Sequence, residues 1–265
     1  MYLGDITWEE AGDYLESNSL ALIPIGSTEQ HGPHLPLATD HVIAEGLARA
    51  AADRGGYICT PTITIGVSPH HRQFYGTMSV DAETFRSYVE SITRSLIYQG
   101  IDRVIYVNAH GGNVSHLREV GRRLHEADDA FAIEWMWDES IPELVDDLFE
   151  INGPHAGPKE TAMVWHLINN VREDRLSNAR DNGLTDRSTA DTVKFGARVF
   201  FDAIENSSNG AFGDPTDATP EKGKQLFEAA CDELVLLCDW LDAQPHKELG
   251  PSPHVRERYQ SDTIR

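Results

Sequence analysis

Short apolar segments alternate with longer amphipathic ones along this chain, and the alternation limits the folds open to it. Residues 20–25 and 103–108 are short apolar runs typical of buried strands. The other expected elements are strands at residues 57–66 and 130–135 and helices at residues 41–53, 81–99, 114–127, 158–170 and 220–241. Strands separated by helices of this length predict an α/β fold with a mostly parallel sheet and helices on both faces.

The chain length favours one large domain. The sequence has 265 residues, with no internal repeat and no linker-like stretch. We expect a single domain over residues 1–242 and a polar, partly disordered tail over residues 243–265. Residues 172–218 are rich in Asn, Asp, Gly and Ser, which predicts loops and a hairpin rather than helices.

The composition narrows the setting in which the protein works. No apolar stretch has the length of a membrane span, and the N-terminus lacks a secretion signal, so we expect neither secretion nor membrane insertion. The 3 cysteines are too few for a disulfide framework and fit a reducing, cytoplasmic compartment. Two of them, Cys231 and Cys238, lie seven apart in a helical pattern and are expected in the core.

The net charge of -21 is extreme, and 17 of the 22 basic residues are Arg rather than Lys. So acidic a surface argues against nucleic acid and anionic membranes as partners. We interpret the acidity as adaptation to a salty cytoplasm (a halophilic protein), since salt screens the repulsion between like charges. The alternative is an ordinary acidic cytosolic protein.

Residues 29–40 gather carboxylates and imidazoles directly after the first predicted strand. Glu29 and Asp40 offer oxygen ligands, and His31 and His34 offer nitrogen ligands. That mixture suits Zn, Mn or Fe better than Ca or Mg, which prefer oxygen alone. The segment therefore predicts a metal site, and the alternative is a polar loop that happens to contain histidines.

Further polar clusters follow other elements. Residues 108–113 read Asn-Ala-His-Gly-Gly-Asn after the strand at 103–108, and residues 155–161 read His-Ala-Gly-Pro-Lys-Glu-Thr at a helix start. A weaker cluster is Pro-His-His at residues 69–71. Each run has a local alternative, a glycine-rich turn or a helix start. Their shared position beyond strand ends favours one common site.

Motifs of several other enzyme classes are absent. The sequence has no Walker A run, no GxGxxG after a strand, no GxSxG elbow and no HExxH helix. Nucleotide binding through those loops, serine hydrolysis of the α/β-hydrolase kind and this type of zinc peptidase are therefore unsupported.

The ordered motifs at residues 26–40, 108–113 and 155–161 resemble those of the creatininase family of metal-dependent amidohydrolases. Residues 213–223 are similar to the C-terminal segment of that family, and the resemblance covers residues 1–242. It implies a three-layer α/β/α sandwich that holds two divalent ions per chain (Zn, Mn or Fe). It also implies a homo-oligomer, often a hexamer, that acts on a small-molecule substrate.

The resemblance also implies a ligand set in which Asp40 bridges two ions. Carried over by motif, the first ion would be held by Glu29, Asp40 and His110, and the second by His31, Asp40 and another acid. In creatininase proper that acid lies two residues after the histidine of the second motif, where this chain has Gly112. Glu160 is our candidate replacement, and the departure argues against creatinine as the substrate.

The expected reaction is hydrolysis of a non-peptide C–N bond in an amide, formamide or cyclic amide. The family includes creatinine hydrolysis, peptide-maturation proteases and an archaeal deformylase of riboflavin and deazaflavin biosynthesis. The acidic composition and Gly112 favour that deformylase, which acts on 2-amino-5-formylamino-6-ribosylaminopyrimidinone 5′-phosphate. Creatinine or another small amide is the alternative. A non-catalytic, metal-binding oligomeric scaffold is a further alternative, against which the complete ligand set argues.

His155 is the predicted acid/base that protonates the leaving nitrogen, and its alternative role is to orient Glu160. The predicted substrate contacts are His70, Arg72, Gly111, Gly112 and Trp137. The two glycines allow close approach, and their N–H groups would face an oxyanion. Arg72 and Lys159 would meet a phosphate. Trp135 and Trp137 would stack on a heterocycle or else lie in the core.

The salt adaptation makes a direct prediction. Molar KCl shortens the Debye length to ~3 Å and so weakens the self-repulsion of the folded chain. We expect the melting temperature to rise between low salt and molar KCl, measured by scanning calorimetry. Sucrose of equal osmolality controls for general solute exclusion. A melting temperature that KCl leaves unchanged, or lowers, contradicts the salt adaptation.

Overall fold

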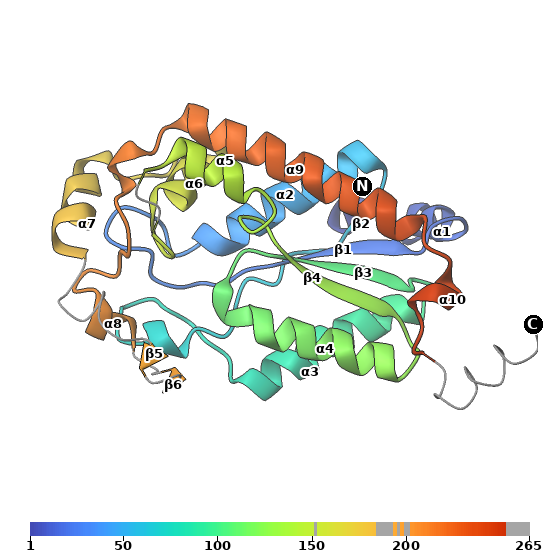
Figure 1. The fold of residues 1–265 in the computed structure, drawn as a ribbon. Coiled ribbons are helices and arrows are strands. Elements are labelled where there is room, and N and C mark those ends of the chain that lie inside the picture. The colour runs from blue at the N-terminus through green and yellow to red at the C-terminus, as the bar shows by residue number, and fades with distance from the viewer. Residues whose placement is uncertain (151–152, 184–192, 195–196, 199–201, 253–265) are drawn as a thin grey trace, which may run out of the picture.

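Four parallel strands form the central sheet, in the order β2-β1-β3-β4 (Figure 1). The computed structural model describes residues 1–150, 153–183, 193–194, 197–198 and 202–252. The strands are β1 (Leu20–Ile25), β2 (Ile58–Cys59), β3 (Arg103–Asn108) and β4 (Phe131–Met136). Every residue of β1 and β3 is buried, as expected for central strands covered on both faces.

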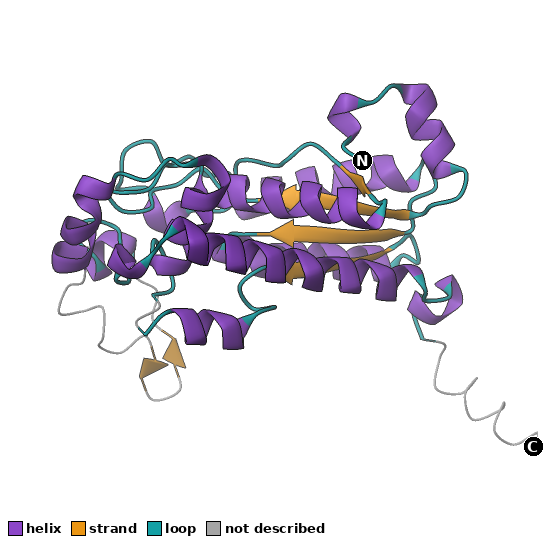
Figure 2. Ribbon diagram, turned by 90° about the horizontal axis from the view of Figure 1, so that it is seen from above, coloured by secondary structure: helices purple, strands orange, loops and turns teal. Residues whose placement is uncertain are grey.

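One face of the sheet is covered by two long helices, α2 (Thr39–Gly55) and α9 (Pro220–Asp242), which run alongside the strands (Figure 2). A third helix, α6 (Pro158–Ile168), packs against both of them and shares their core. The strand residues that share a core with them are Leu20, Leu22, Ile105 and Val107. These positions alternate along β1 and β3, because successive side chains of a strand point to opposite faces.

The opposite face packs against α3 (Ala82–Ile97) and α4 (Val114–Glu126) (Figure 1). The strand residues on this side are Ala21, Ile23, Ile25, Val104 and Tyr106, the other half of the alternation. Two helical layers therefore enclose one parallel sheet, which confirms the predicted three-layer α/β/α fold.

The ends of the long helices follow from local chemistry. Asp81 caps α3 by accepting from two backbone N–H groups of the first turn, and Thr219 caps α9 in the same way with one. Such caps contribute about 1 kcal/mol each. At the other end, Asn169 takes a left-handed conformation (φ 50°) and ends α6.

The predicted strand at residues 57–66 is mostly wrong. Regular pairing covers only Ile58–Cys59. The N–H of Thr60 donates to Leu22 of β1, but the next donor to β1 is Ile63, one residue later than a regular ladder requires, so one extra residue interrupts the pairing near Pro61. Beyond the proline, Ile63 still exchanges hydrogen bonds with the edge of β1, through Pro24 and Gly26. This irregular segment therefore stays attached to the sheet.

Several short elements were not predicted. They are α1 (Trp8–Leu15), α5 (Pro142–Leu148), α7 (Leu176–Gly183), α8 (Ala203–Asn206) and α10 (His246–Leu249). α7 and α8 fall in the region expected to be loops, where the expected hairpin is formed by β5 (Val193–Lys194) and β6 (Ala197–Arg198). α10 lies in the predicted tail, of which residues 253–265 are outside the described part.

Cys59, Cys231 and Cys238 are buried and free, so the expected core position of the last two is confirmed. None of the helices in the described part of the chain has the length and hydrophobicity needed to cross a bilayer.

Candidate metal centre and active site

The carboxyl ends of β1 and β3 lie side by side, and the segments that follow them carry the candidate ligands. Gly26 allows the chain to pass directly against the start of α2. A Cβ there would lie 2.3 Å from the backbone nitrogen of His41, so a larger residue does not fit. The close approach places Asp40, in the first turn of α2, beside the segment that carries Glu29.

The segment after β3 is held by an asparagine. The side chain of Asn108 accepts a hydrogen bond from the backbone N–H of His110 (3.1 Å) and donates one to its carbonyl oxygen (3.0 Å). Both ends of the His110 backbone are thereby fixed, so the imidazole is directed back toward β1.

The third segment reaches the site through a tight turn before α6. Ala156 in that turn has a positive φ of 51°, an uncommon conformation for a residue with a side chain. His34 lies in the segment after β1 and connects that segment to α6, because its Nε2 lies 2.9 Å from the hydroxyl of Thr161. Glu160 precedes that threonine and is therefore carried to the same place.

Asp40 lies at the centre of the cluster. Its Oδ1 is 2.9 Å from Nε2 of His31, and its Oδ2 is 3.2 Å from Nδ1 of His110. That same nitrogen of His110 is 3.3 Å from Oε1 of Glu29. Acids and imidazoles that are far apart in sequence thus converge in one buried pocket.

The protons of His31 and His110 can be assigned from their main-chain partners, because a carbonyl oxygen only accepts. Nδ1 of His31 donates to the carbonyl oxygen of Glu29 (3.1 Å), and Nε2 of His110 donates to that of Val67 (3.2 Å). The other nitrogen of each neutral ring therefore points a lone pair at a carboxylate. Two acceptors at this distance repel unless a cation lies between them.

The electrostatics of the pocket show the same demand for positive charge. Burial opposes ionisation, yet Asp40 and neighbouring acids raise the pKa of His31 to about 10. Burial likewise opposes protonation of His110, yet Glu29 and Asp40 raise the pKa of His110 well above its usual value. Within the described chain, both oxygens of Glu29 and Oδ2 of Asp40 have no hydrogen-bond partner. The donor set fits a divalent metal ion.

Glu160 adds a second group of candidate ligands. Ligand atoms of Glu160, His31 and His155 lie within 4.8 Å of one another. Burial raises the pKa of Glu160 to about 7, and its Oε2 has no hydrogen-bond partner in the described chain. A buried, unpartnered carboxylate beside imidazole lone pairs is suited to a cation.

Position 112 is closed to an acidic side chain. A Cβ on Gly112 would lie 2.3 Å from the carbonyl oxygen of Val67 and 2.4 Å from Nε2 of His110. The acid found there in creatininase proper would displace the very group that holds His110. Any replacement must therefore come from elsewhere in the chain.

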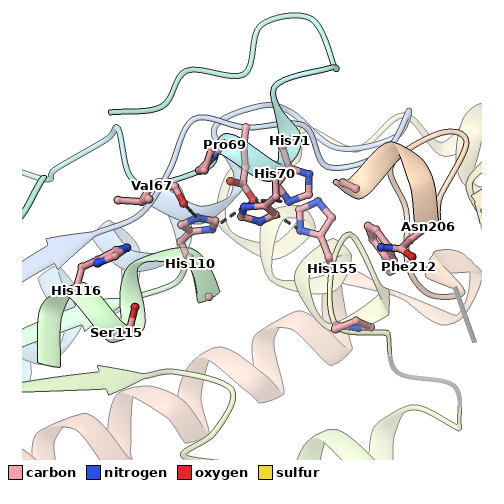
Figure 3. A pocket seen from close by; sticks show the side chains of 15 residues that line it. Val67, Pro69, His70, His71, His110, Ser115, His116, His155, Asn206 and Phe212 are labelled. Atoms are coloured by element: carbon pink, nitrogen blue, oxygen red, sulfur yellow. Dashed lines mark hydrogen bonds and ion pairs between the residues drawn. The ribbon is translucent and has the colours of Figure 1, made fainter. Parts of the chain in front are cut away.

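A cavity of about 580 Å³ opens over the cluster (Figure 3). The imidazoles of His70, His71, His110 and His155 gather along it, and Gly111 and Gly112 also line it. Its apolar lining residues are Val67, Pro69, Pro154, Ala203 and Phe212. The described lining contains no Lys or Arg.

The structure brings most of the predicted site residues together. Those that converge are Glu29, His31, Asp40, His110, His155 and Glu160, and those that line the cavity include His70, Gly111 and Gly112. It does not bring Arg72 and Trp137 to the cavity. Arg72 is exposed and pairs with Asp202 (2.9 Å), and Trp137 is 2% exposed in the hydrophobic core.

Two residues of the site were given no role from the sequence. His71 belongs to the weaker Pro-His-His cluster, and its Nε2 lies 3.4 Å from Oε1 of Glu29. Gln30 sits between two predicted ligands, and its side-chain amide lies 2.8 Å from His71. The adjacent histidines were a usable signal for the first, whereas an amide inside a polar loop gives none.

A parallel α/β fold with buried carboxylates and imidazoles at its strand ends is suited to hold a catalytic metal ion. The chain belongs to the creatininase family, which matches residues 4–238 and is described as creatinine amidohydrolase. The predicted family and enzyme class are therefore confirmed.

Named relatives differ in their reactions. The chain is 36% identical over 225 residues to the mycofactocin precursor peptide peptidase of Mycobacterium ulcerans, covering 81% of this chain and 82% of that protein. It is 26% identical over 232 residues to the 2-amino-5-formylamino-6-ribosylaminopyrimidin-4(3H)-one 5′-monophosphate deformylase of Methanobrevibacter smithii, covering 82% and 89%. A solved structure described as a manganese creatininase superposes on this chain with a TM-score of 0.75 and 22% sequence identity. The superposition covers 92% of this chain and 99% of that structure.

The role of Glu160 can be tested by Glu160→Gln, which keeps the shape of the side chain and removes its charge. We expect fewer metal ions per chain, measured by plasma emission spectroscopy after dialysis, and a loss of activity. The matched control is Glu143→Gln, on the exposed side of α5. If Glu160→Gln keeps the wild-type metal content and affinity, another group replaces the acid missing at Gly112.

Proposed function

We propose that this chain is a metal-dependent peptidase that hydrolyses an amide bond in a short peptide. The observation that carries the proposal is the extended similarity to a precursor peptide peptidase, which covers about four-fifths of both chains. This differs from the non-peptide substrate expected from the sequence. The deformylase expected there shares less identity with this chain and remains the second candidate.

The chemistry of the cavity supports a peptide over a phosphorylated nucleotide. A phosphate would need cationic partners, and besides Ser115, Asn206 and the carboxylate of Glu29 the polar side chains of the described lining are imidazoles. The two cations predicted as phosphate contacts are both engaged, Arg72 with Asp202 and Lys159 with Asp138. The volume, about 580 Å³, lies within the range of small-ligand sites and leaves room for several peptide groups.

Two divalent ions, with Asp40 between them, are part of the proposal. The two oxygens of Asp40 face different imidazoles, that of His31 and that of His110, which supports a bridging role. Glu29 would complete the ligand set of the ion held by His110, and Glu160 that of the ion held by His31. Ions of this kind polarise a carbonyl group and lower the pKa of water toward ~7. The ligand set accepts Zn, Mn or Fe.

His155 is suited to move the proton of the attacking water. Its Nε2 donates to the carbonyl oxygen of Gln30 (2.8 Å), which leaves a lone pair on Nδ1. Nδ1 faces Oε1 of Glu29 at 3.8 Å, and the ring lines the cavity. Nδ1 takes a proton from water as the C–O bond forms and returns it to the leaving nitrogen as the C–N bond breaks.

A parallel assay separates the candidate functions. The metal-loaded enzyme is incubated with a mixed pool of short peptides, with the formamidopyrimidine ribonucleotide, and with creatinine. We expect new peptide fragments by mass spectrometry, no formate and no creatine. Asp40→Ala serves as the inactive control. Release of formate without peptide cleavage overturns the proposal in favour of the deformylase. Metal binding without turnover of any substrate favours the non-catalytic scaffold.

His155→Ala tests the proton transfer. We expect kcat to fall by about 10²–10⁴ while the metal content stays at the wild-type level, because the proposal assigns His155 to proton transfer and the ions to the other candidate ligands. The matched control is His125→Ala, on α4 outside the cavity. Turnover near the wild-type rate would refute the acid/base role, and loss of metal would make His155 a ligand instead.

Three other expectations stay predictions. These are assembly into a homo-oligomer such as a hexamer, a cytoplasmic location, and adaptation to high salt. Sedimentation velocity of the purified protein, in low and molar KCl, measures the first directly.

A further inference from the structure

The side chain of Gln30 has only one possible orientation. Its Oε1 lies 2.9 Å from the backbone N–H of Gly32, which only donates, and its Nε2 lies 3.1 Å from the carbonyl oxygen of Gly210, which only accepts. Gly210 has a φ of 87°, and a Cβ there would lie 1.7 Å from Oε1 of Gln30. Only glycine allows this close contact.

The orientation of Gln30 determines where His71 carries its proton. One amide hydrogen is directed at the carbonyl oxygen of Gly210. The same nitrogen lies 2.8 Å from Nδ1 of His71 and 2.9 Å from Nε2 of His155. Because Nε2 of His155 donates its proton to the main-chain carbonyl of Gln30 (2.8 Å), it cannot accept, and the second amide hydrogen is left for Nδ1 of His71. Nδ1 must then be an acceptor, so the neutral ring carries its proton on Nε2. Nε2 lies 3.4 Å from Oε1 of Glu29, with which it forms no hydrogen bond in the described chain, so this N–H has no protein acceptor there.

His71 is thereby the opposite of the other three histidines around Glu29. His31, His110 and His155 each tie their N–H to a main-chain carbonyl and present a lone pair. His71 has its lone pair occupied by Gln30 and presents an N–H. As a metal ligand through Nε2, it would need its proton on Nδ1, opposite the amide N–H of Gln30.

We propose that His71 is a hydrogen-bond donor to the substrate carbonyl oxygen rather than a metal ligand, and that Gln30 is the residue that positions its proton. The inference rests on the proposed amide hydrolysis. His71 lines the cavity and stacks against His155, with ring centroids 4.4 Å apart. Donor and base are therefore adjacent and face the same space (Figure 3).

The two rings divide the reaction between them. As the oxygen of water bonds to the carbonyl carbon, the π electrons move to the carbonyl oxygen, and the water proton moves to Nδ1 of His155. The Nε2–H of His71 donates a hydrogen bond to that oxygen and keeps its own proton. When the carbonyl re-forms, the C–N bond breaks and the nitrogen takes the proton from His155. The products are a carboxylic acid and an amine.

The proton positions can be measured without any substrate. In zinc-loaded protein labelled with ¹⁵N-histidine, two-bond proton–nitrogen correlations distinguish protonated from bare ring nitrogens, and the spectrum of His71→Gln assigns the His71 signals. We expect a bare Nδ1 and a protonated Nε2. Gln30→Glu, which offers only acceptors, is expected to move the proton to Nδ1. A protonated Nδ1 in the wild-type protein overturns the proposal.

Two substitutions at His71 separate donation from ligation. Leu keeps much of the volume without a donor, and Gln keeps an N–H near the position of Nε2. We expect both to retain wild-type metal content. His71→Leu should lower kcat by about 10²–10³ with little change in KM. The kcat of His71→Gln should be at least about tenfold higher than that of His71→Leu. Loss of metal in either variant, or no recovery with Gln, overturns the proposal. His125→Leu is the control.

These readouts distinguish the two proposals from each other. Proton positions and metal content need no substrate, so they stand even if the enzyme acts on a nucleotide instead of a peptide. Conversely, peptide cleavage together with a protonated Nδ1 on His71 refutes only the inference about His71.

Discussion

The carboxylates of Glu29 and Asp40 face imidazole nitrogens at hydrogen-bond distance, with no proton to share in the neutral state. Each imidazole has its single N–H committed to a main-chain carbonyl. A cluster of acceptors buried in this way is costly unless a cation neutralises it. The rest of the site, including the cavity above it and the rings that line it, is arranged around that requirement.

The fold meets the requirement by its topology. β1 and β3 are neighbours, run parallel and end in register at Ile25 and Asn108, so the segments that follow must meet. Each strand contributes part of the cluster, and α2 and α6 bring the rest on their first turns. The side chains are therefore held by the most buried part of the molecule, which limits their movement when charge develops.

The sequence predicts the parts of this arrangement that depend on local pattern. The strands predicted at residues 20–25 and 103–108 begin and end at the same residues as the observed strands, because a fully buried apolar run has few other interpretations. The strand expected at residues 57–66 loses its regular pairing after Thr60, where one extra residue before Ile63 breaks the alternation that the β-branched pattern predicted. The convergence of Asp40 with His110 depends on β1 and β3 being neighbours, which no local pattern predicts, and only the ligand set implied by the family resemblance paired the two residues.

Other parts of the site depend on three-dimensional contacts that no sequence pattern encodes. Arg72 and Trp137 had plausible chemistry, yet an ion pair and the core hold them away from the cavity. Gln30 carries no motif of its own, and its importance lies in what its amide faces.

Gly112 also limits how this protein can change. The carbonyl of Val67 occupies the space where a side chain at position 112 would begin, and that carbonyl also anchors His110. An acid at position 112 and an anchored His110 are therefore alternatives within this backbone. Moving the ligand from one position to the other would require coordinated changes in two loops, so a single substitution gives no direct evolutionary route between the two arrangements.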